Sequence, residues 1–179
     1  MPAVLWRLGV TRGGKSSSVD REHLRVRTST SDASVYPGNR FTLFIEVEPL
    51  PGVHVYGPQV GGGYQRLEVA IDPLPYLTGH PPRYPTANTL TLPWTDESLT
   101  GYAEPVRVAI DVSLDARQEL APVLEAGRGL TVAGTLRVQA CDDRVCWAPE
   151  AISLSWHVDL RPPDLERSPE PLQHRPKAN

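Results

Sequence analysis

Apolar and polar residues alternate along several short stretches of the chain, which is the pattern of strands with one buried face. The alternation is clearest in Phe41–Val47 and Pro105–Leu114. It recurs in His23–Ser31, Leu130–Cys141 and Ala151–Leu160, with turn residues between the stretches. About seven to nine short strands of this kind predict an all-β fold, a β-sandwich, with a small β-barrel as the alternative architecture.

Helical periodicity is confined to Asp115–Ala126, where Asp115 would be the N-cap and Gly127 the stop. The 179 residues include 19 prolines and 14 glycines. This proline content is about twice the average and favours turns over helices. The net charge of −3, without any basic stripe, speaks against a nucleic-acid partner.

The folded domain is expected to cover residues 22–160. Residues 1–21 are expected to be a flexible linker or the end of an upstream domain, and the proline-rich residues 161–179 a disordered tail. Residues 9–16 formally match a phosphate-binding loop. That interpretation is rejected because no convincing strand precedes them and no helix follows.

Both cysteines of the chain, Cys141 and Cys146, lie in the stretch Gly134–Pro149 between two strand patterns. Five extended residue steps would span roughly 16–18 Å, whereas a disulfide needs Cα atoms about 4.4–6.8 Å apart. The chain must therefore reverse across residues 142–145 for the sulfurs to bond. Aspartate favours such a reversal because its carboxylate can accept hydrogen bonds from nearby backbone, so the two cysteines can pair.

Three uses for the cysteine pair remain open at this point: a structural staple, a reversible dithiol/disulfide pair and half of a metal site. A staple gains little, since closing so short a loop stabilises by only about 2 kcal/mol. A zinc site would need His54, His80 or His157 to complete it, and no motif places them there. We expect neither a metal nor another cofactor.

The neighbouring charges bear on the redox poise of the pair. Asp142 and Asp143 disfavour a thiolate, whereas Arg144 favours it. The balance predicts thiols that are not strongly acidified, which points to a pair that donates electrons.

The cysteine segment GTLRVQACDDRVCWAP resembles that of the N-terminal domain of the thiol:disulfide interchange protein DsbD, in which Gln-(Ala/Gly)-Cys…Cys-aromatic-x-Pro recurs. The resemblance covers roughly Leu24 to Leu160. Weaker matches stand upstream in the same order, at Tyr36–Gly38, Gly52–Tyr56, Tyr84-Pro85 and Gly101-Tyr102. One departure is that four residues separate the cysteines here, against five in the best-known members.

The resemblance implies an immunoglobulin-like sandwich and a redox role for Cys141 and Cys146. The cysteines would take electrons from a membrane-embedded reductase domain and pass them to thioredoxin-like thiol proteins, in processes such as cytochrome c biogenesis. By analogy, Cys141 is favoured as the sulfur that forms the mixed disulfide. The residues expected to shape the approach surface are Gln139, Asp142, Asp143, Trp147 and Pro149.

Shielding of the disulfide is also implied by the resemblance, through a cap loop expected at Leu92–Asp96 and including Trp94. His54 and Tyr56 would lie near the cysteines and either shield the sulfurs or bond to their surroundings. From the residues alone, His54 and Tyr56 are more often structural, and Trp94 can equally pack on the sandwich.

The location and the wider protein are expectations of the same resemblance. It implies a periplasmic or otherwise extracytoplasmic domain. The sequence has no stretch of about 18 apolar residues, so no direct membrane insertion is expected, and the domain is expected to be monomeric. No signal peptide precedes it, so we expect a fragment of a larger protein, fused for example to a thioredoxin-like or peroxiredoxin-like domain, with a cytoplasmic variant as the alternative. The competing functional hypothesis is a non-enzymatic binding module with a structural disulfide.

Overall fold

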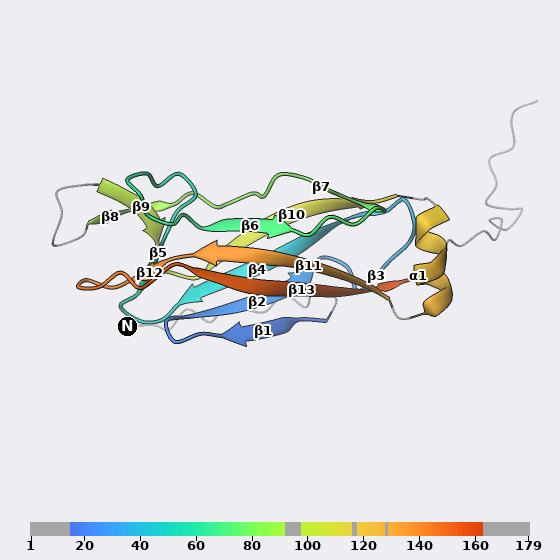
Figure 1. Ribbon diagram of the computed structural model, residues 1–179, viewed down its shortest axis with the longest axis horizontal. Coiled ribbons are helices and arrows are strands. Elements are labelled where there is room, and N and C mark those ends of the chain that lie inside the picture. Colours follow the sequence, from blue (N-terminus) through green and yellow to red (C-terminus); the bar gives the residue numbers. More distant parts are fainter. Residues whose placement is uncertain (1–14, 92–97, 116–117, 128, 163–179) are drawn as a thin grey trace, which may run out of the picture.

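The computed structural model describes residues 15–91, 98–115, 118–127 and 129–162, and strands dominate it (Figure 1). The strands are β1 (Ser17–Asp20), β2 (Leu24–Thr30), β3 (Ser34–Val35), β4 (Arg40–Pro49), β5 (His54–Tyr56), β6 (Glu68–Ile71), β7 (Leu77–Gly79), β8 (Asn88–Thr91), β9 (Ser98–Tyr102), β10 (Val106–Leu114), β11 (Leu130–Val138), β12 (Ala140–Cys141) and β13 (Glu150–Leu160). A 3-10 turn, η1 (Gln118–Leu120), leads into the short helix α1 (Ala121–Ala126).

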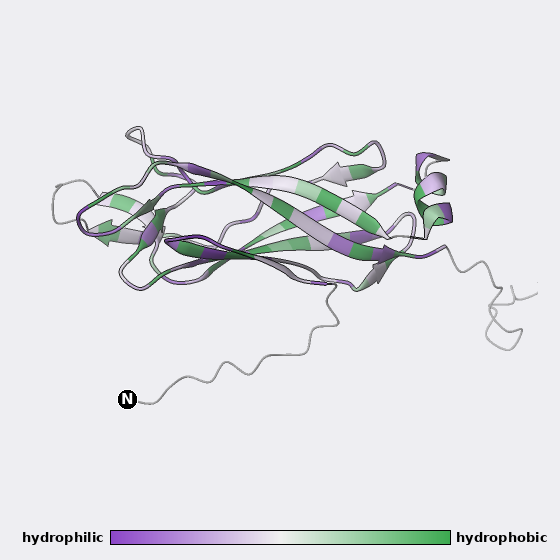
Figure 2. Ribbon diagram, turned by 60° about the horizontal axis from the view of Figure 1, so that its bottom comes forward, coloured by the Kyte–Doolittle hydropathy of each residue, from purple (hydrophilic) through white to green (hydrophobic). Residues whose placement is uncertain are grey.

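Two sheets form the body of the molecule, one in the order β1-β2-β4-β10-β7 and the other in the order β3-β13-β11-β6. Their inward side chains make one apolar core, and along β4 and β10 every second residue is buried. Figure 2 shows the same alternation of apolar and polar residues along the strands. The predicted all-β, immunoglobulin-like sandwich is therefore confirmed.

Trp156 joins the two sheets across the core. Its side chain is only 1% exposed, and its indole N–H donates a hydrogen bond of 2.9 Å to the backbone carbonyl of Phe44. A buried indole needs such a partner, because an unpaired buried N–H is costly. The bond thus fixes β13 of one sheet against β4 of the other.

A third, small sheet in the order β12-β5-β9-β8 lies at one end of the sandwich, and α1 lies at the opposite end (Figure 1). The sequence predicted one strand from Leu130 to Cys141, but the strand breaks at Gln139. Up to Val138 it pairs with β13, whereas Ala140 and Cys141 pair with β5. The first cysteine therefore belongs to a different sheet from the strand that leads to it.

Gly101 allows the small sheet to close. A Cβ atom at this position would overlap the carbonyl oxygen of Val55 and the Cδ1 atom of Leu90. Only glycine lets β9 approach β5 and β8 this closely, because it carries no side chain.

Three expectations about the elements need correction. Ser17–Asp20 is a strand paired with β2 and not part of a linker; its four mostly polar residues give too short an alternation to recognise. Ser98–Tyr102, where the sequence analysis expected no strand, forms β9. The helix begins at Ala121 instead of after Asp115, because Pro122 suits only a first helical turn, while its stop at Gly127 (φ 61°) is confirmed.

Candidate functional site

A disulfide joins Cys141 and Cys146 at the tip of a hairpin, with a Cα–Cα distance of 4.1 Å. The amide of Asp142 donates to the carbonyl of Val145 (2.9 Å), and the amide of Trp147 donates to the carbonyl of Ala140 (3.0 Å). These two bonds close the four-residue turn that the spacing of the cysteines predicted.

Asp142 holds this turn together from inside. Its Oδ1 atom accepts hydrogen bonds of 2.7 Å from the amides of both Arg144 and Val145. These backbone bonds, first of all that from Val145, lower the pKa of the Asp142 carboxyl, so it stays ionised as an acceptor. Asp142 thus shapes the turn. Asp143 and Pro149, which are also predicted to form the approach surface, are exposed.

The two sulfur-bearing residues differ sharply in exposure. Cys141 is fully buried within the small sheet, at 0% exposure, whereas Cys146 is exposed. An exchange reaction requires a sulfur that an incoming thiolate can reach. Because Cys141 exposes no surface, only Cys146 of this disulfide can offer its sulfur to a partner.

Tyr56 contacts both sulfurs from the buried side of the disulfide. Its side chain is fully buried, and its hydroxyl oxygen lies 3.3 Å from the Sγ atom of Cys141 and 3.3 Å from that of Cys146. A disulfide sulfur has no hydrogen, so the hydroxyl is the donor. Burial, followed by the neighbouring Tyr64, raises the pKa of Tyr56 to about 12, so the hydroxyl keeps its proton at neutral pH.

His54 lies directly opposite Cys141 in the pairing of β5 with β12, and it shares one face of β5 with Tyr56. Its side chain is buried, and its Nε2 atom has no hydrogen-bond partner among the described residues. Burial lowers the pKa of His54, although Asp143 and then Asp142 oppose this shift. The structure therefore places both His54 and Tyr56 beside the cysteines.

Gln139 fastens the hairpin to the rest of the domain where the strand changes sheets. Its side-chain oxygen accepts a hydrogen bond from the amide of Gln65, and its side-chain nitrogen donates to the carbonyl of Trp147, each 3.0 Å long. Trp147 in turn stacks on His23, with ring centroids 3.6 Å apart. Both residues position the hairpin.

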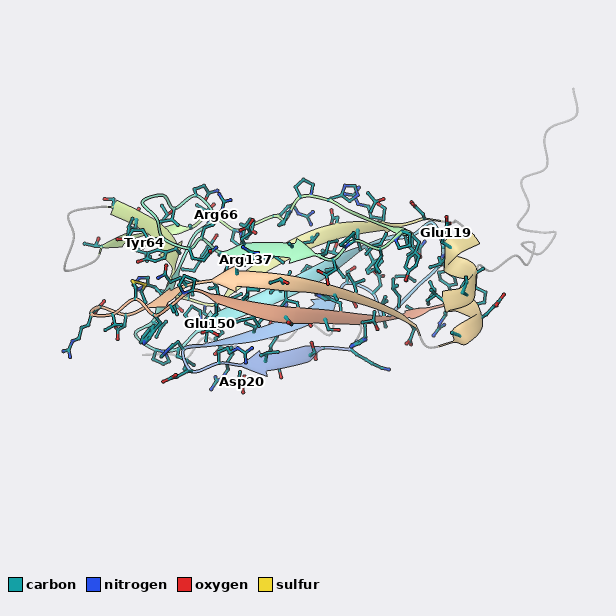
Figure 3. The ribbon with its side chains drawn as sticks, in the orientation of Figure 1. Asp20, Tyr64, Arg66, Glu119, Arg137 and Glu150 are labelled. Carbon is teal, nitrogen blue, oxygen red and sulfur yellow. A yellow bond between two sulfur atoms is a disulfide. The ribbon has the colours of Figure 1, made fainter. Side chains whose placement is uncertain are left out.

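The expected cap at Leu92–Asp96, with Trp94, lies outside the described residues. Three residues that the sequence analysis missed do lie at the site: Tyr64 (Figure 3), Gln65 and His23. The ring of Tyr64 is 4.6 Å from that of Tyr56. No sequence pattern links them to the cysteines. Val145 was also missed. It is 49% exposed beside Cys146, and an apolar residue in an otherwise charged turn was the available signal.

Other candidate groups lie apart from the sulfurs. His80 bonds to Ser113 and His157 to Thr131. Within the described part of the chain, no three histidine, cysteine or acidic residues are close enough to hold a metal ion. In that same part, no helix has the length and apolar character needed to cross a membrane.

Comparison with known proteins places this geometry in a family. The family model "Thiol:disulfide interchange protein DsbD, N-terminal" matches residues 22–155, which include both cysteines. No curated protein matches the chain. A similar solved structure is the N-terminal periplasmic domain of ScsB from Proteus mirabilis, with a TM-score of 0.50 and 17% identity over 81% of this chain. This likeness shows the fold alone, and the chain spans about half (51%) of that one. Because the family model covers most of its length, the chain belongs to the family of the N-terminal domain of the thiol:disulfide interchange protein DsbD.

Proposed function

We propose that this domain is a thiol–disulfide exchange module that carries two electrons at a time on the Cys141–Cys146 pair. The observation that carries the proposal is the unequal exposure of the cysteines: Cys146 is exposed, and Cys141 is buried against the Tyr56 hydroxyl. A staple needs no accessible sulfur, whereas an exchange disulfide does. Membership of the DsbD family supports the same function.

The exposure also favours one order of attack. A thiolate of the electron donor attacks the Sγ atom of Cys146, and a mixed disulfide forms as the Cys141–Cys146 bond breaks. The electron pair of that bond leaves on the sulfur of Cys141, which takes up a proton. Analogy favoured Cys141 as the sulfur of the mixed disulfide, but its burial supports Cys146 in that role and Cys141 as the leaving group.

The second half of the reaction completes the electron balance. A second thiolate of the donor attacks its own sulfur in the mixed disulfide and releases Cys146 as a thiolate. The donor leaves as a disulfide, and the module holds two thiols. In the opposite direction, the Cys146 thiolate attacks the disulfide of an acceptor, and Cys141 then resolves the mixed disulfide.

Tyr56 is suited to assist the leaving sulfur. Its hydroxyl keeps its proton and already lies 3.3 Å from the sulfur of Cys141. A hydrogen bond to a thiolate is stronger than one to a neutral disulfide, because the acceptor is charged. The hydroxyl therefore stabilises the transition state more than the starting disulfide.

The direction of electron flow and the partners follow the family. The donor we propose is a membrane-embedded disulfide reductase domain, and the acceptors are thioredoxin-like thiol proteins outside the cytoplasm. The charges near the sulfurs, two aspartates and one arginine, support a pair that is not a strong oxidant. The exposed Val145 supplies an apolar contact for either partner beside the reacting sulfur.

Single-cysteine variants test the proposal. With Cys141→Ser, the exposed Cys146 should form a mixed disulfide with a thioredoxin-like protein, and it should react with an aromatic disulfide reagent roughly tenfold or more faster than Cys141 does in Cys146→Ser. Circular dichroism of both variants checks the fold. Equal reactivity would overturn the assigned roles. A wild-type reduction potential below about −300 mV with slow exchange would overturn the function and leave a structural disulfide.

A further inference from the structure

A solvent-open hollow of about 340 Å³ adjoins the cysteine hairpin. Three of its lining residues carry ionisable groups: His54 opposite Cys141, Asp143 in the cysteine turn, and Glu104, which follows β9. The rest of the wall is formed by Gly52, Val53, Leu90, Thr91 and Ala103. A group that enters this hollow therefore lies beside the turn that carries Cys146.

The wall of the hollow contains a buried hydrogen-bonding atom without a partner among the described residues, the Nε2 atom of His54. The residue is only 6% exposed. Buried polar atoms in folded proteins almost always have a partner, so an exception in the wall of a hollow points to a ligand. Neither Asp142 nor Tyr56, the other polar groups near it, bonds to this nitrogen.

The charge of the hollow is negative. Asp143 and Glu104 are exposed, and neither has an ion-pair partner in the part of the chain that the structure describes. None of the described lining residues is a lysine or an arginine. Burial lowers the pKa of His54, against the opposing effect of Asp143 and Asp142, so His54 adds no positive charge at neutral pH.

A second surface groove shows the contrast. It is larger, about 570 Å³, and Glu104 borders it as well as the hollow. Its glutamates on β4 are paired, Arg25 with Glu48 and Arg107 with Glu46, whereas Glu104 has no ion-pair partner among the described residues. The carboxylates beside the disulfide have no such partners. Their charge is available to a ligand.

We propose that the hollow is a docking subsite for a basic side chain, lysine or arginine, that stands next to the reactive cysteine of the thiol protein with which Cys146 exchanges. This inference rests on the proposed function and adds a specificity to it. The cationic end lies between Asp143 and Glu104, and the partner's cysteine is thereby held at the exposed sulfur. Charge complementarity of this kind acts mainly on the rate of association.

Two short cysteine peptides with blocked termini provide the test, one with lysines and one with glutamates beside the cysteine. The measurement is the second-order rate constant for reducing the Cys141–Cys146 disulfide. For the wild type we expect the lysine peptide to be faster by roughly three- to tenfold, and the difference to shrink in about 0.5 M salt. The double variant Asp143→Asn, Glu104→Gln should lose most of this preference.

The matched control is Glu119→Gln, Glu125→Gln, which changes the net charge equally at the α1 end of the molecule (Figure 3). It should keep the preference of the wild type. Ala103→Leu keeps both carboxylates but narrows the hollow, and it should reduce the preference as well. A preference that survives in the Asp143, Glu104 variant, or that Ala103→Leu leaves unchanged, would overturn the subsite.

β-Mercaptoethanol, which has no cationic group to place in the hollow, separates this outcome from failure of the proposed function. It should reduce the disulfide in every variant. Its attacking form is an anionic thiolate, so loss of the two carboxylates should speed it slightly through weaker repulsion and should not slow it. If it reduces the disulfide while the two peptides react equally, the subsite is wrong and the exchange function stands. If no thiol reduces the disulfide of the folded protein, the exchange function itself is wrong.

Discussion

The hydroxyl oxygen of Tyr56 lies 3.3 Å from the Sγ atom of Cys141, and both side chains are completely buried. Through this contact, a side chain buried in the small sheet reaches the disulfide at the sheet's edge. A change at Tyr56 should therefore alter the exchange reaction without touching any exposed atom.

Tyr56→Phe removes only the hydroxyl. We expect reduction of the disulfide by dithiothreitol to slow by roughly two- to tenfold, the worth of one hydrogen bond to the leaving sulfur. Stopped-flow measurement of the rate checks this. Tyr64→Phe removes the same atom from the adjacent ring and should react like the wild type. Equal rates for all three proteins would show that the hydroxyl does not assist the reaction.

His54→Phe should change how stability depends on pH. Burial lowers the pKa of His54 in the folded protein below its ordinary value of 6.5, so the unfolded chain binds the proton more readily. The wild type should keep its full stability above pH 6.5 and lose part of it as the pH falls through the folded value. The variant should lose less between pH 7.5 and pH 5. Urea unfolding at both pH values measures this, and parallel losses would contradict it.

Gln139→Ala removes both hydrogen bonds that hold the hairpin where the strand changes sheets. We expect the free energy of unfolding to fall by about 1–3 kcal/mol, since two amide partners are lost. We also expect the amide of Trp147 to exchange its hydrogen faster. Gln65→Ala is the matched control, because only the backbone amide of Gln65 takes part in the bridge. Equal effects of the two substitutions would argue against the bridge.

Asp142→Ala removes the acceptor that closes the cysteine turn. The open form should become relatively more favourable, so the reduction potential should become less negative. Equilibration in glutathione buffers measures the potential. Asp142→Asn keeps an acceptor oxygen and removes the charge, and its potential should stay closer to that of the wild type. If both variants shift equally, the charge and not the turn sets the potential.

The sandwich could be predicted from the sequence because its long strands each bury one face. In β4 and β10, alternation over nine or ten residues reflects the burial of every second side chain. The shorter strands β1 and β9 carry no comparable pattern, because a strand of four or five residues at an edge or in a small sheet has few inward positions to mark it.

At the site, local chemistry was predictable and distant contacts were not. The spacing of the cysteines and the turn-forming Asp142 predicted the hairpin, and both lie within six consecutive residues. The contacts of His23 with Trp147 and of Gln65 with Gln139 could not be predicted, because the packing of separate elements brings these residues together. The unequal exposure of the two cysteines also depends on packing, since only Cys141 lies within a sheet.

Of the two cysteines only Cys146 is exposed, and this has a consequence for the kinetics of the proposed exchange. Under the proposed function, donor and acceptor would meet the same atom, so they would occupy the domain in turn and never together. We then expect a ping-pong scheme, in which each partner competitively inhibits the other's half-reaction. Because the disulfide closes a loop of only a few residues, we expect its reduction to leave the sandwich in place, so that both partners would meet the same surface in each cycle.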